Sequence, residues 1–161
     1  HRLFHVVPFL WRFHKVHHAD NDVDVTTGLR FHTVSMVFSM GVKMSAAVLL
    51  GVSPVAVLVS ETALNLTAMF NHANIRIPIA LDRVLRWFVV TPDMHRVHHS
   101  VHGGEMSKNF GFNFPWWDRV LGTYRDQPAA GHDATVNGLR EHQADSDQSL
   151  IWMVALPFHR R

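Results

Sequence analysis

A five-residue pattern of histidines occurs twice in the chain and constrains its fold more than any other feature. The two segments, at 14–18 and 95–99, both have the order His-basic-Val-His-His. Residues three and four positions apart share one face of a helix, so each segment directs three imidazoles into one small volume. His1 and His5 have the same four-residue spacing. Burying so many ring nitrogens is costly unless each one finds a partner.

A metal centre is the partner that this arrangement predicts, because neutral imidazole is the commonest metal-binding side chain. The predicted ligands are all histidines: His1, His5, His14, His17, His18, His72, His95, His98 and His99. Eight or nine imidazoles exceed what one ion binds and match two ions, each with four or five nitrogen ligands. Adjacent histidines such as His17 and His18 can each turn to a different ion. Imidazole binds iron, zinc, copper and nickel alike, so ligand type leaves the metal open.

Other polar residues near these segments have weaker predicted roles. Asp20, Asp93 and Asp118 are candidates to accept N–H bonds from ligand imidazoles, and helix capping or turn formation is the alternative for Asp20 and Asp93. Asn109 is a candidate to hold the loop beneath the site. The remaining histidines are predicted to lie outside the ligand set: His32 as a structural residue, His102 in a loop, and His132, His142 and His159 in solvated segments.

The spacing of apolar residues predicts an all-α fold. A helix over 1–18, broken near Pro8, is expected to be followed by a loop over 19–28. Residues 34–70 are nearly all apolar or small and predict a helical hairpin that turns at 51–54. Each half is slightly shorter than the roughly 20 residues of a spanning helix, which favours a transmembrane or re-entrant hairpin. Lys43 and Glu61 oppose a membrane position, and a buried hairpin in a soluble core is the alternative.

The second half of the chain predicts shorter elements. Residues 80–90 form an amphipathic pattern, and a helix beginning at Thr91-Pro92-Asp93 carries the second histidine segment. An ordered, aromatic-rich loop is expected over 102–124, a polar exposed stretch over 127–148, and a short apolar segment over 149–158. The formal charge is only +2, and no block of Lys and Arg occurs, so a nucleic-acid partner is not expected.

Several metal chemistries are excluded by the residues present. There are no cysteines, which removes zinc–cysteine sites and iron–sulfur clusters. The chain has neither the His-Glu-x-x-His of zinc proteases nor the Glu-x-x-His of soluble di-iron bundles. Haem requires one or two axial histidines rather than three on one turn. An all-histidine dinuclear centre in an apolar helical protein remains, and O₂ activation is the chemistry that best uses such a centre.

The ordered histidine boxes with their flanks resemble the fatty acid hydroxylase/sterol desaturase superfamily. The matching segments are His1-Arg2-Leu3-Phe4-His5, Leu10 to His18, Phe70-Asn71-His72-Ala73-Asn74-Ile75, Thr91 to Ser100, Asn109-Phe110-Gly111 and Trp117 to Tyr124. The resemblance implies a catalytic domain over 1–124, followed by a tail with a short apolar segment over 125–161. The chain starts at His1 without an initiator Met, so we expect the domain to be N-terminally truncated.

The resemblance also implies how the protein works. It implies two iron ions, O₂ as co-substrate, and hydroxylation or desaturation of a lipid C–H bond. Electrons come from an external donor of the cytochrome b5, ferredoxin or flavoprotein type. The implied location is integral to a membrane, bacterial inner membrane or endoplasmic reticulum, with the histidine-box helices forming a cytosolic cap. Two other functions stay open: a metal-handling membrane protein without redox turnover, and a dinuclear zinc hydrolase.

Overall fold

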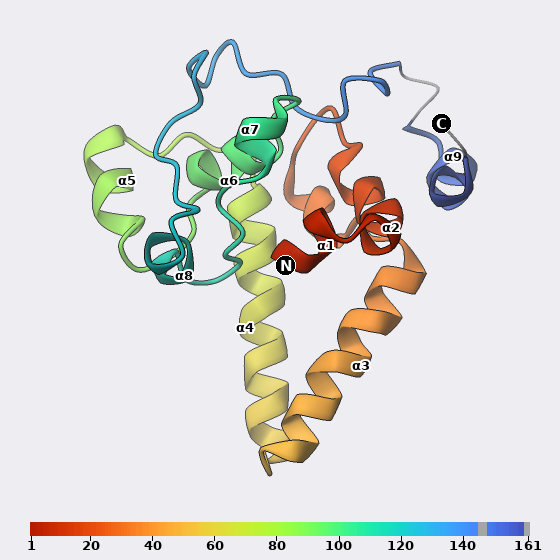
Figure 1. The fold of residues 1–161 in the computed structure, drawn as a ribbon. Helices are drawn as coiled ribbons and strands as arrows, with labels where there is room; N and C mark the ends of the chain where they lie inside the picture. Colours follow the sequence, from red (N-terminus) through yellow and green to blue (C-terminus); the bar gives the residue numbers. More distant parts are fainter. Residues whose placement is uncertain (145–147, 160–161) are drawn as a thin grey trace.

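A computed structural model describes residues 1–144 and 148–159, and within these ranges the fold is helical with no β-strand. The prediction of an all-α fold is confirmed. The elements, in chain order, are α1 (Arg2–Val6), α2 (Pro8–His18), η1 (Val25–Leu29), α3 (Thr33–Leu49), α4 (Pro54–His72), α5 (Ile79–Leu85), α6 (Pro92–His98), α7 (Gly103–Met106), α8 (Trp116–Val120), α9 (Leu150–Ala155) and η3 (Leu156–Phe158). Two long helices project from a body made of all the others (Figure 1).

The break near Pro8 divides the N-terminal segment into α1 and α2, as predicted. Val7 is extended, with φ −93° and ψ 113°, and Pro8 occupies the first turn of α2, where its missing N–H costs nothing. The chain changes direction at this point, and α1 packs against α2. His1 and His5 are thereby brought to His14, which no continuous helix would allow.

The predicted hairpin is present as α3 and α4, and it turns where the sequence indicates. Gly51 has φ +65°, a conformation that favours glycine, and the side chain of Ser53 accepts a hydrogen bond from the Ala56 N–H at the start of α4. The two helices diverge from this turn toward the body (Figure 1). Within the described residues, neither helix is both long and apolar enough to cross a bilayer by itself.

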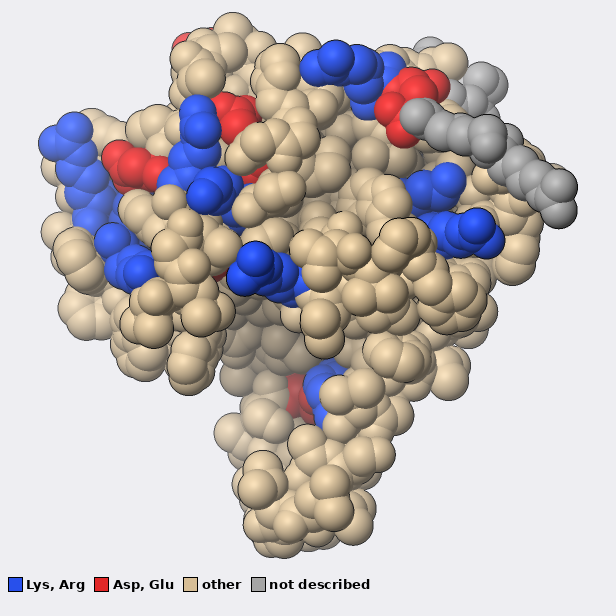
Figure 2. Space-filling model, in the orientation of Figure 1, with Lys and Arg blue, Asp and Glu red and all other residues tan. Residues whose placement is uncertain are grey.

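Charge is distributed unevenly between the body and the hairpin. Lys and Arg side chains are spread over the body, whereas the hairpin is almost uncharged (Figure 2). Its two charged residues are Lys43 on α3 and Glu61 on α4, and they form an ion pair at 2.5 Å. The charges that opposed a membrane position in the sequence therefore neutralise each other across the hairpin.

Three sequence expectations about the body need correction. The loop over 19–28 runs into a 3-10 helix, η1, because Asp24 caps it through a reciprocal bond pair with Thr27. The amphipathic helix expected over 80–90 ends at Leu85, since the chain turns there to place Arg86 in the interior. The loop over 102–124 contains two short helices, α7 and α8, which periodicity over so few residues could not reveal.

The C-terminal segment contacts the rest of the protein. Leu139 and Leu156 are buried in one cluster with Val16 of the first histidine segment and with Ala19, which follows that segment. Residues 127–144 are mostly exposed, as predicted, but Pro128, Gly138 and Leu139 are buried. The outer side of α9 remains exposed at Leu150 and Ile151, so this helix covers α2 with one face only.

Gly28 allows η1 to approach α4 closely, and its replacement tests that contact. A Cβ at Gly28 would lie 3.0 Å from the Ala68 carbonyl oxygen, whereas one at Gly41 on α3 would meet nothing within 4 Å. We expect Gly28→Ala to destabilise the protein by about 1–3 kcal/mol through overpacking. Gly41→Ala should stabilise it by roughly 0.5–1 kcal/mol, because alanine is the better helix former. Thermal unfolding of the two variants gives the comparison, and equal melting temperatures would contradict it.

Candidate metal centre

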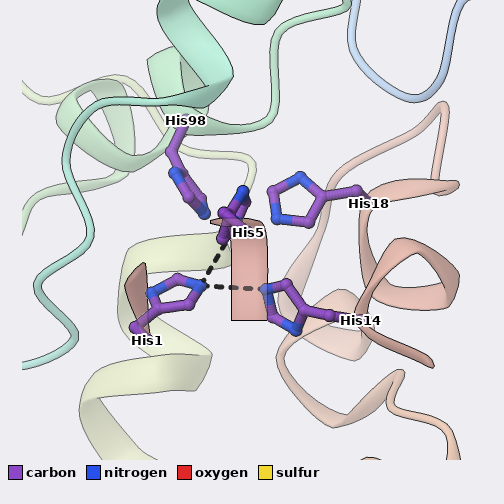
Figure 3. Close-up of side chains that lie close together, drawn as sticks. All are labelled: His1, His5, His14, His18 and His98. Atoms are coloured by element: carbon purple, nitrogen blue, oxygen red, sulfur yellow. Dashed lines mark hydrogen bonds between the residues drawn. The ribbon is translucent and has the colours of Figure 1, made fainter. Parts of the chain in front are cut away.

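The nine histidines singled out in the sequence come together in two groups. His1, His5, His14, His18 and His98 form the first group, in which every residue offers a ring nitrogen within 4.8 Å of those of the others (Figure 3). His17, His72, His95 and His99 form the second group under the same limit. Five separate elements or segments contribute to this assembly: residue 1, α1, α2, the end of α4, and α6 with the residue after it. Their assignment as metal ligands remains a prediction.

Adjacent histidines divide between the two groups. His17 joins the second group and His18 the first, while His99 joins the second and His98 the first. This is the geometry expected from neighbouring positions on a helix, whose side chains diverge by about 100°. The rings of His18 and His99 stack at 4.6 Å, so the two groups touch. The arrangement can hold two ions next to each other.

Burial keeps these imidazoles neutral. It lowers the pKa of His5 to about 3, and it holds the pKa values of His14, His18, His95 and His98 well below the ordinary 6.5. Neighbouring imidazoles act in the same direction, because two cations in one buried space repel. A neutral ring presents a lone pair, which is the form that binds a metal.

The same shifts predict how the metal-free protein responds to acid. Below about pH 6.5 the unfolded chain binds protons on these rings while the folded chain does not, so folding is opposed by about 1.4 kcal/mol per ring and pH unit. We expect the melting temperature of metal-stripped protein to fall steadily between about pH 7.5 and about pH 5.5. Circular dichroism melts at several pH values measure this decrease in melting temperature. A melting temperature that is constant over this range would contradict the neutral assignment.

Backbone carbonyls set the orientation of three of the rings. The Nδ1–H groups of His1 and His98 donate to the carbonyls of Phe110 and Lys108, each at 2.7 Å, and that of His72 donates to Ala68 at 2.6 Å. A ring that donates through Nδ1 has its lone pair on Nε2. In each case Nε2 is the nitrogen that faces the other histidines.

Asn109 makes two of these carbonyl contacts possible. It lies between Lys108 and Phe110 and has φ +53°, a left-handed conformation that asparagine tolerates better than most residues. Its buried amide donates to the carbonyls of Met94 and Arg125 and accepts from the Arg125 N–H. The prediction that Asn109 holds the loop beneath the site is consistent with this network.

The three aspartates do not accept bonds from the imidazoles, contrary to one of the two expectations. Asp20 accepts from the Thr27 hydroxyl, and Asp93 pairs with Arg96. Asp118 accepts from the N–H groups of Phe110 and Gly111, so it fixes the loop whose carbonyl contacts His1. It supports the first group through the backbone rather than by direct contact.

The other histidines lie outside both groups. His32 caps α3 by accepting a bond from the Val34 N–H, which agrees with a structural role. His102 lies in a bend before α7, in agreement with its predicted loop position, and His159 is exposed, as predicted. His132 and His142 were predicted to be solvated but are half-buried, His132 beside Asp93 and His142 against the ring of Trp152.

The residues present fit two metal ions. Nε2 of His72, which carries a lone pair, lies 3.1–3.2 Å from Nε2 of His17, His95 and His99, so four ring nitrogens converge on one small space that a cation could occupy. Both ring nitrogens of His18 and Nε2 of His98 are buried without any hydrogen-bond partner. Unsatisfied buried nitrogens are expensive in a folded protein, and a metal would satisfy them.

A pocket leads from the hairpin to the first group. It has a volume of about 440 Å³ and extends between α3 and α4, with Phe4, Met40 and Leu64 among its apolar walls. His1 and His14 line its inner end. The second group does not line this pocket, and all four of its histidines are buried. The two groups therefore differ in their access to a ligand.

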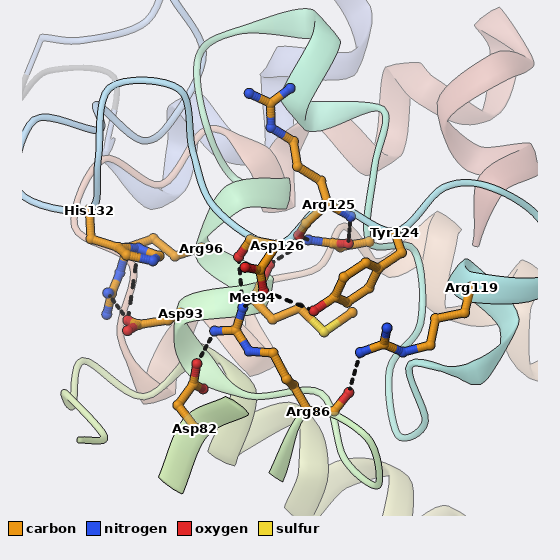
Figure 4. Close-up of polar contacts among 11 residues, drawn as sticks. Asp82, Arg86, Asp93, Met94, Arg96, Arg119, Tyr124, Arg125, Asp126 and His132 are labelled. Atoms are coloured by element: carbon orange, nitrogen blue, oxygen red, sulfur yellow. Dashed lines mark hydrogen bonds and ion pairs between the residues drawn. The ribbon is translucent and has the colours of Figure 1, made fainter. Parts of the chain in front are cut away.

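An ionic network is centred on the buried side chain of Arg86 (Figure 4). Arg86 is 2% exposed and forms ion pairs with Asp82 and with Asp126, the latter at 2.5 Å. Arg119 packs over the ring of Tyr124 at 3.9 Å and donates to the Arg86 carbonyl at 3.1 Å. Only the helix spacing of Asp82 and Arg86 signalled this network in the sequence.

Fold and site together define a class of protein: an all-helical chain built around two all-histidine groups that could bind two metal ions. The fatty acid hydroxylase family matches residues 1–123, and the chain belongs to this family. It is 33% identical to ornithine lipid hydroxylase of Rhizobium tropici over 80% of the chain, and 32% identical to human cholesterol 25-hydroxylase over 78%. Alkylglycerol monooxygenase of Xenopus tropicalis is 30% identical over 77%.

The chain spans less than half the length of these relatives. The matched regions cover 38% of the ornithine lipid hydroxylase, 45% of the cholesterol 25-hydroxylase and 27% of the alkylglycerol monooxygenase. No solved structure matches the chain at a significant level.

Proposed function

We propose that the protein hydroxylates a C–H bond of a lipid, using O₂ and two iron ions held by the nine histidines. The observation that carries this proposal is the pair of adjacent all-histidine groups, one of which lines an apolar pocket. The relatives named above are hydroxylases and a monooxygenase, which favours hydroxylation over desaturation. Desaturation uses the same centre, and analysis of the product distinguishes the two.

The chain's own residues bind the lipid and keep water away. Two bound iron ions would supply the activation of O₂ that an unreactive C–H bond requires. Phe4, Phe31 and Phe112 line the histidine end of the pocket and make it a poor site for water. In the overall reaction, one oxygen atom enters the C–H bond and the other leaves as water. Two electrons come from an external donor of the cytochrome b5, ferredoxin or flavoprotein type, and two protons come from the solvent.

Access to lipid would come through the hairpin. Val48, Leu49 and Leu50, near its tip, are 77%, 85% and 79% exposed, and α3 has a single buried residue, Ser35. An apolar surface of this size is unfavourable in water and is typical of membrane contact. We propose that the hairpin inserts into the bilayer and that the body lies on its cytosolic surface as a cap. The mouth of the pocket would then receive lipid directly.

Metal analysis with an oxygen assay tests this function. The intact protein, purified in detergent after iron-replete expression, should contain about two iron ions per chain and show a coupled di-iron signal by Mössbauer spectroscopy. With a chemical reductant and a lipid extract it should consume O₂ and yield a hydroxylated product detectable by mass spectrometry.

Two outcomes would support other functions. Stoichiometric zinc that persists under iron-replete expression, with hydrolysis of an ester substrate, would support a dinuclear hydrolase. Bound metal that exchanges freely, without O₂ uptake in the presence of reductant, would support a metal-handling protein. Either result would overturn the proposed hydroxylase.

A further inference from the structure

The pocket has a polar end as well as a histidine end. Lys43 and Glu61 both line it, on opposite helices of the hairpin, and so does Asn65, one turn of α4 closer to the body. Glu61 lies seven residues before Ala68 on α4, which corresponds to about 10 Å along the helix axis. The Ala68 carbonyl accepts the hydrogen bond that orients His72. The ion pair thus lies well away from the histidines, but in the same pocket.

The ion pair has unused hydrogen-bonding capacity that faces this pocket. The Lys43 ammonium has three donors, and the Glu61 carboxylate has about four acceptor positions, yet one hydrogen bond joins them, and neither bonds to another of the residues that the structure describes. Their side chains are 34% and 26% exposed, so both are accessible from the pocket. Ser39 adds a hydroxyl to the same wall.

A purely structural role is the alternative. A buried ion pair often contributes little to stability compared with apolar residues of the same volume, because desolvating two charges is costly. An ion pair whose only role was to join α3 to α4 would not need to line a pocket. The accessible position, next to two neutral polar side chains, is what a site for a polar group requires.

We propose that Lys43 and Glu61 determine substrate specificity by binding an uncharged polar group of the lipid, a hydroxyl or an amide, while a carbon further along its apolar chain lies at His1 and His14, which line the same pocket. A hydroxyl or amide both donates and accepts, so it can bond to Glu61 and Lys43 together. A carboxylate would compete with Glu61 for Lys43 and leave one anion without a partner. The substrate class is therefore a lipid with a neutral polar group at one end of an apolar chain.

This proposal rests on the proposed function for the reaction, but its test uses binding alone. Radiolabelled cetyl alcohol, palmitate and hexadecane share a chain length and differ in their polar end. We expect the detergent-purified protein to bind cetyl alcohol at least tenfold more tightly than the other two. In the double variant Lys43→Met, Glu61→Leu, which keeps the side chains' bulk, the alcohol should bind no better than hexadecane, with metal content unchanged.

The matched control is Ser60→Ala. Ser60 precedes Glu61 on α4 but bonds to the carbonyl of Val57 in its own helix and does not line the pocket. This variant should keep the preference for the alcohol. Retention of that preference in the Lys43, Glu61 double variant would show that the pair only joins the helices. Tighter binding of palmitate than of cetyl alcohol would overturn the neutral-group assignment.

A second measurement needs no variant and holds even if the double variant fails to fold. Saturating cetyl alcohol should slow acetylation of Lys43 by acetic anhydride at least fivefold, read by mass spectrometry, whereas hexadecane should not. Lys108, whose ammonium contacts the Gly122 carbonyl at the surface, is the internal control and should react equally in all cases. Equal protection of Lys43 by both lipids would overturn the proposal. Loss of O₂ uptake with intact alcohol preference would overturn the hydroxylase function alone.

Discussion

Replacing His72 with alanine should reduce bound metal from about two ions per chain to about one and abolish lipid hydroxylation. Nε2 of His72 lies within 3.2 Å of Nε2 of His17, His95 and His99, and its Nδ1–H is held by the Ala68 carbonyl. Removal of this ring leaves the second group with three histidines, while all five members of the first group are untouched. Metal content by mass spectrometry and product formation are the two measurements.

His32→Ala is the matched control for this variant. His32 is also a histidine at a helix end, but it bonds to the Val34 N–H and belongs to neither group. It should retain two metals and most of its activity. Loss of both metals from the His72 variant would indicate that the groups bind as one cooperative unit, and retention of both would exclude His72 as a ligand.

Replacing Arg86 with methionine should destabilise the folded protein by about 3–5 kcal/mol. Asp82 is 0% exposed and pairs with Arg86, so the variant leaves a carboxylate buried without its cation. Asp126 loses the same partner. Chemical denaturation in mild detergent, followed by circular dichroism, measures the change in unfolding free energy.

Two further variants show whether burial of the Asp82 carboxylate causes the loss of stability. Arg76 pairs with Asp133 at the surface, where the side chains are 74% and 80% exposed, so Arg76→Met should cost at most about 1 kcal/mol. Adding Asp82→Leu to Arg86→Met should recover much of the lost stability, because no charge then remains buried at that position. Equal losses for the Arg76 and Arg86 variants would refute the explanation.

The sequence predicted the candidate site better than it predicted the body around it. Spacings of three and four fix which side of a helix a histidine occupies, so the division of His17 and His18 between two groups followed from local geometry alone. The turn at Gly51 and the break at Pro8 were equally predictable, because both depend on the backbone preferences of one residue.

What the sequence did not predict depends on contacts between distant segments. The partners of His1 and His98 are main-chain carbonyls 109 and 10 residues away along the chain, and a carbonyl carries no residue-specific signal. The sequence predicts aspartates as the hydrogen-bond acceptors of the imidazoles, because a side-chain acceptor can be identified from residue type and a main-chain carbonyl cannot. The pairing of Lys43 with Glu61 was missed in the same way, since it depends on how two helices face each other.

The closed second group has a consequence for how the protein matures. Its four histidines are all buried, whereas His1 and His5 of the first group are partly exposed. An ion bound in the second group can leave only when the fold opens locally, so its exchange should follow the opening rate of the cap. A chelator should therefore remove the two ions in separate phases, a fast one and a slow one. An ion in the second group would therefore have to enter before α4 and α6 come together.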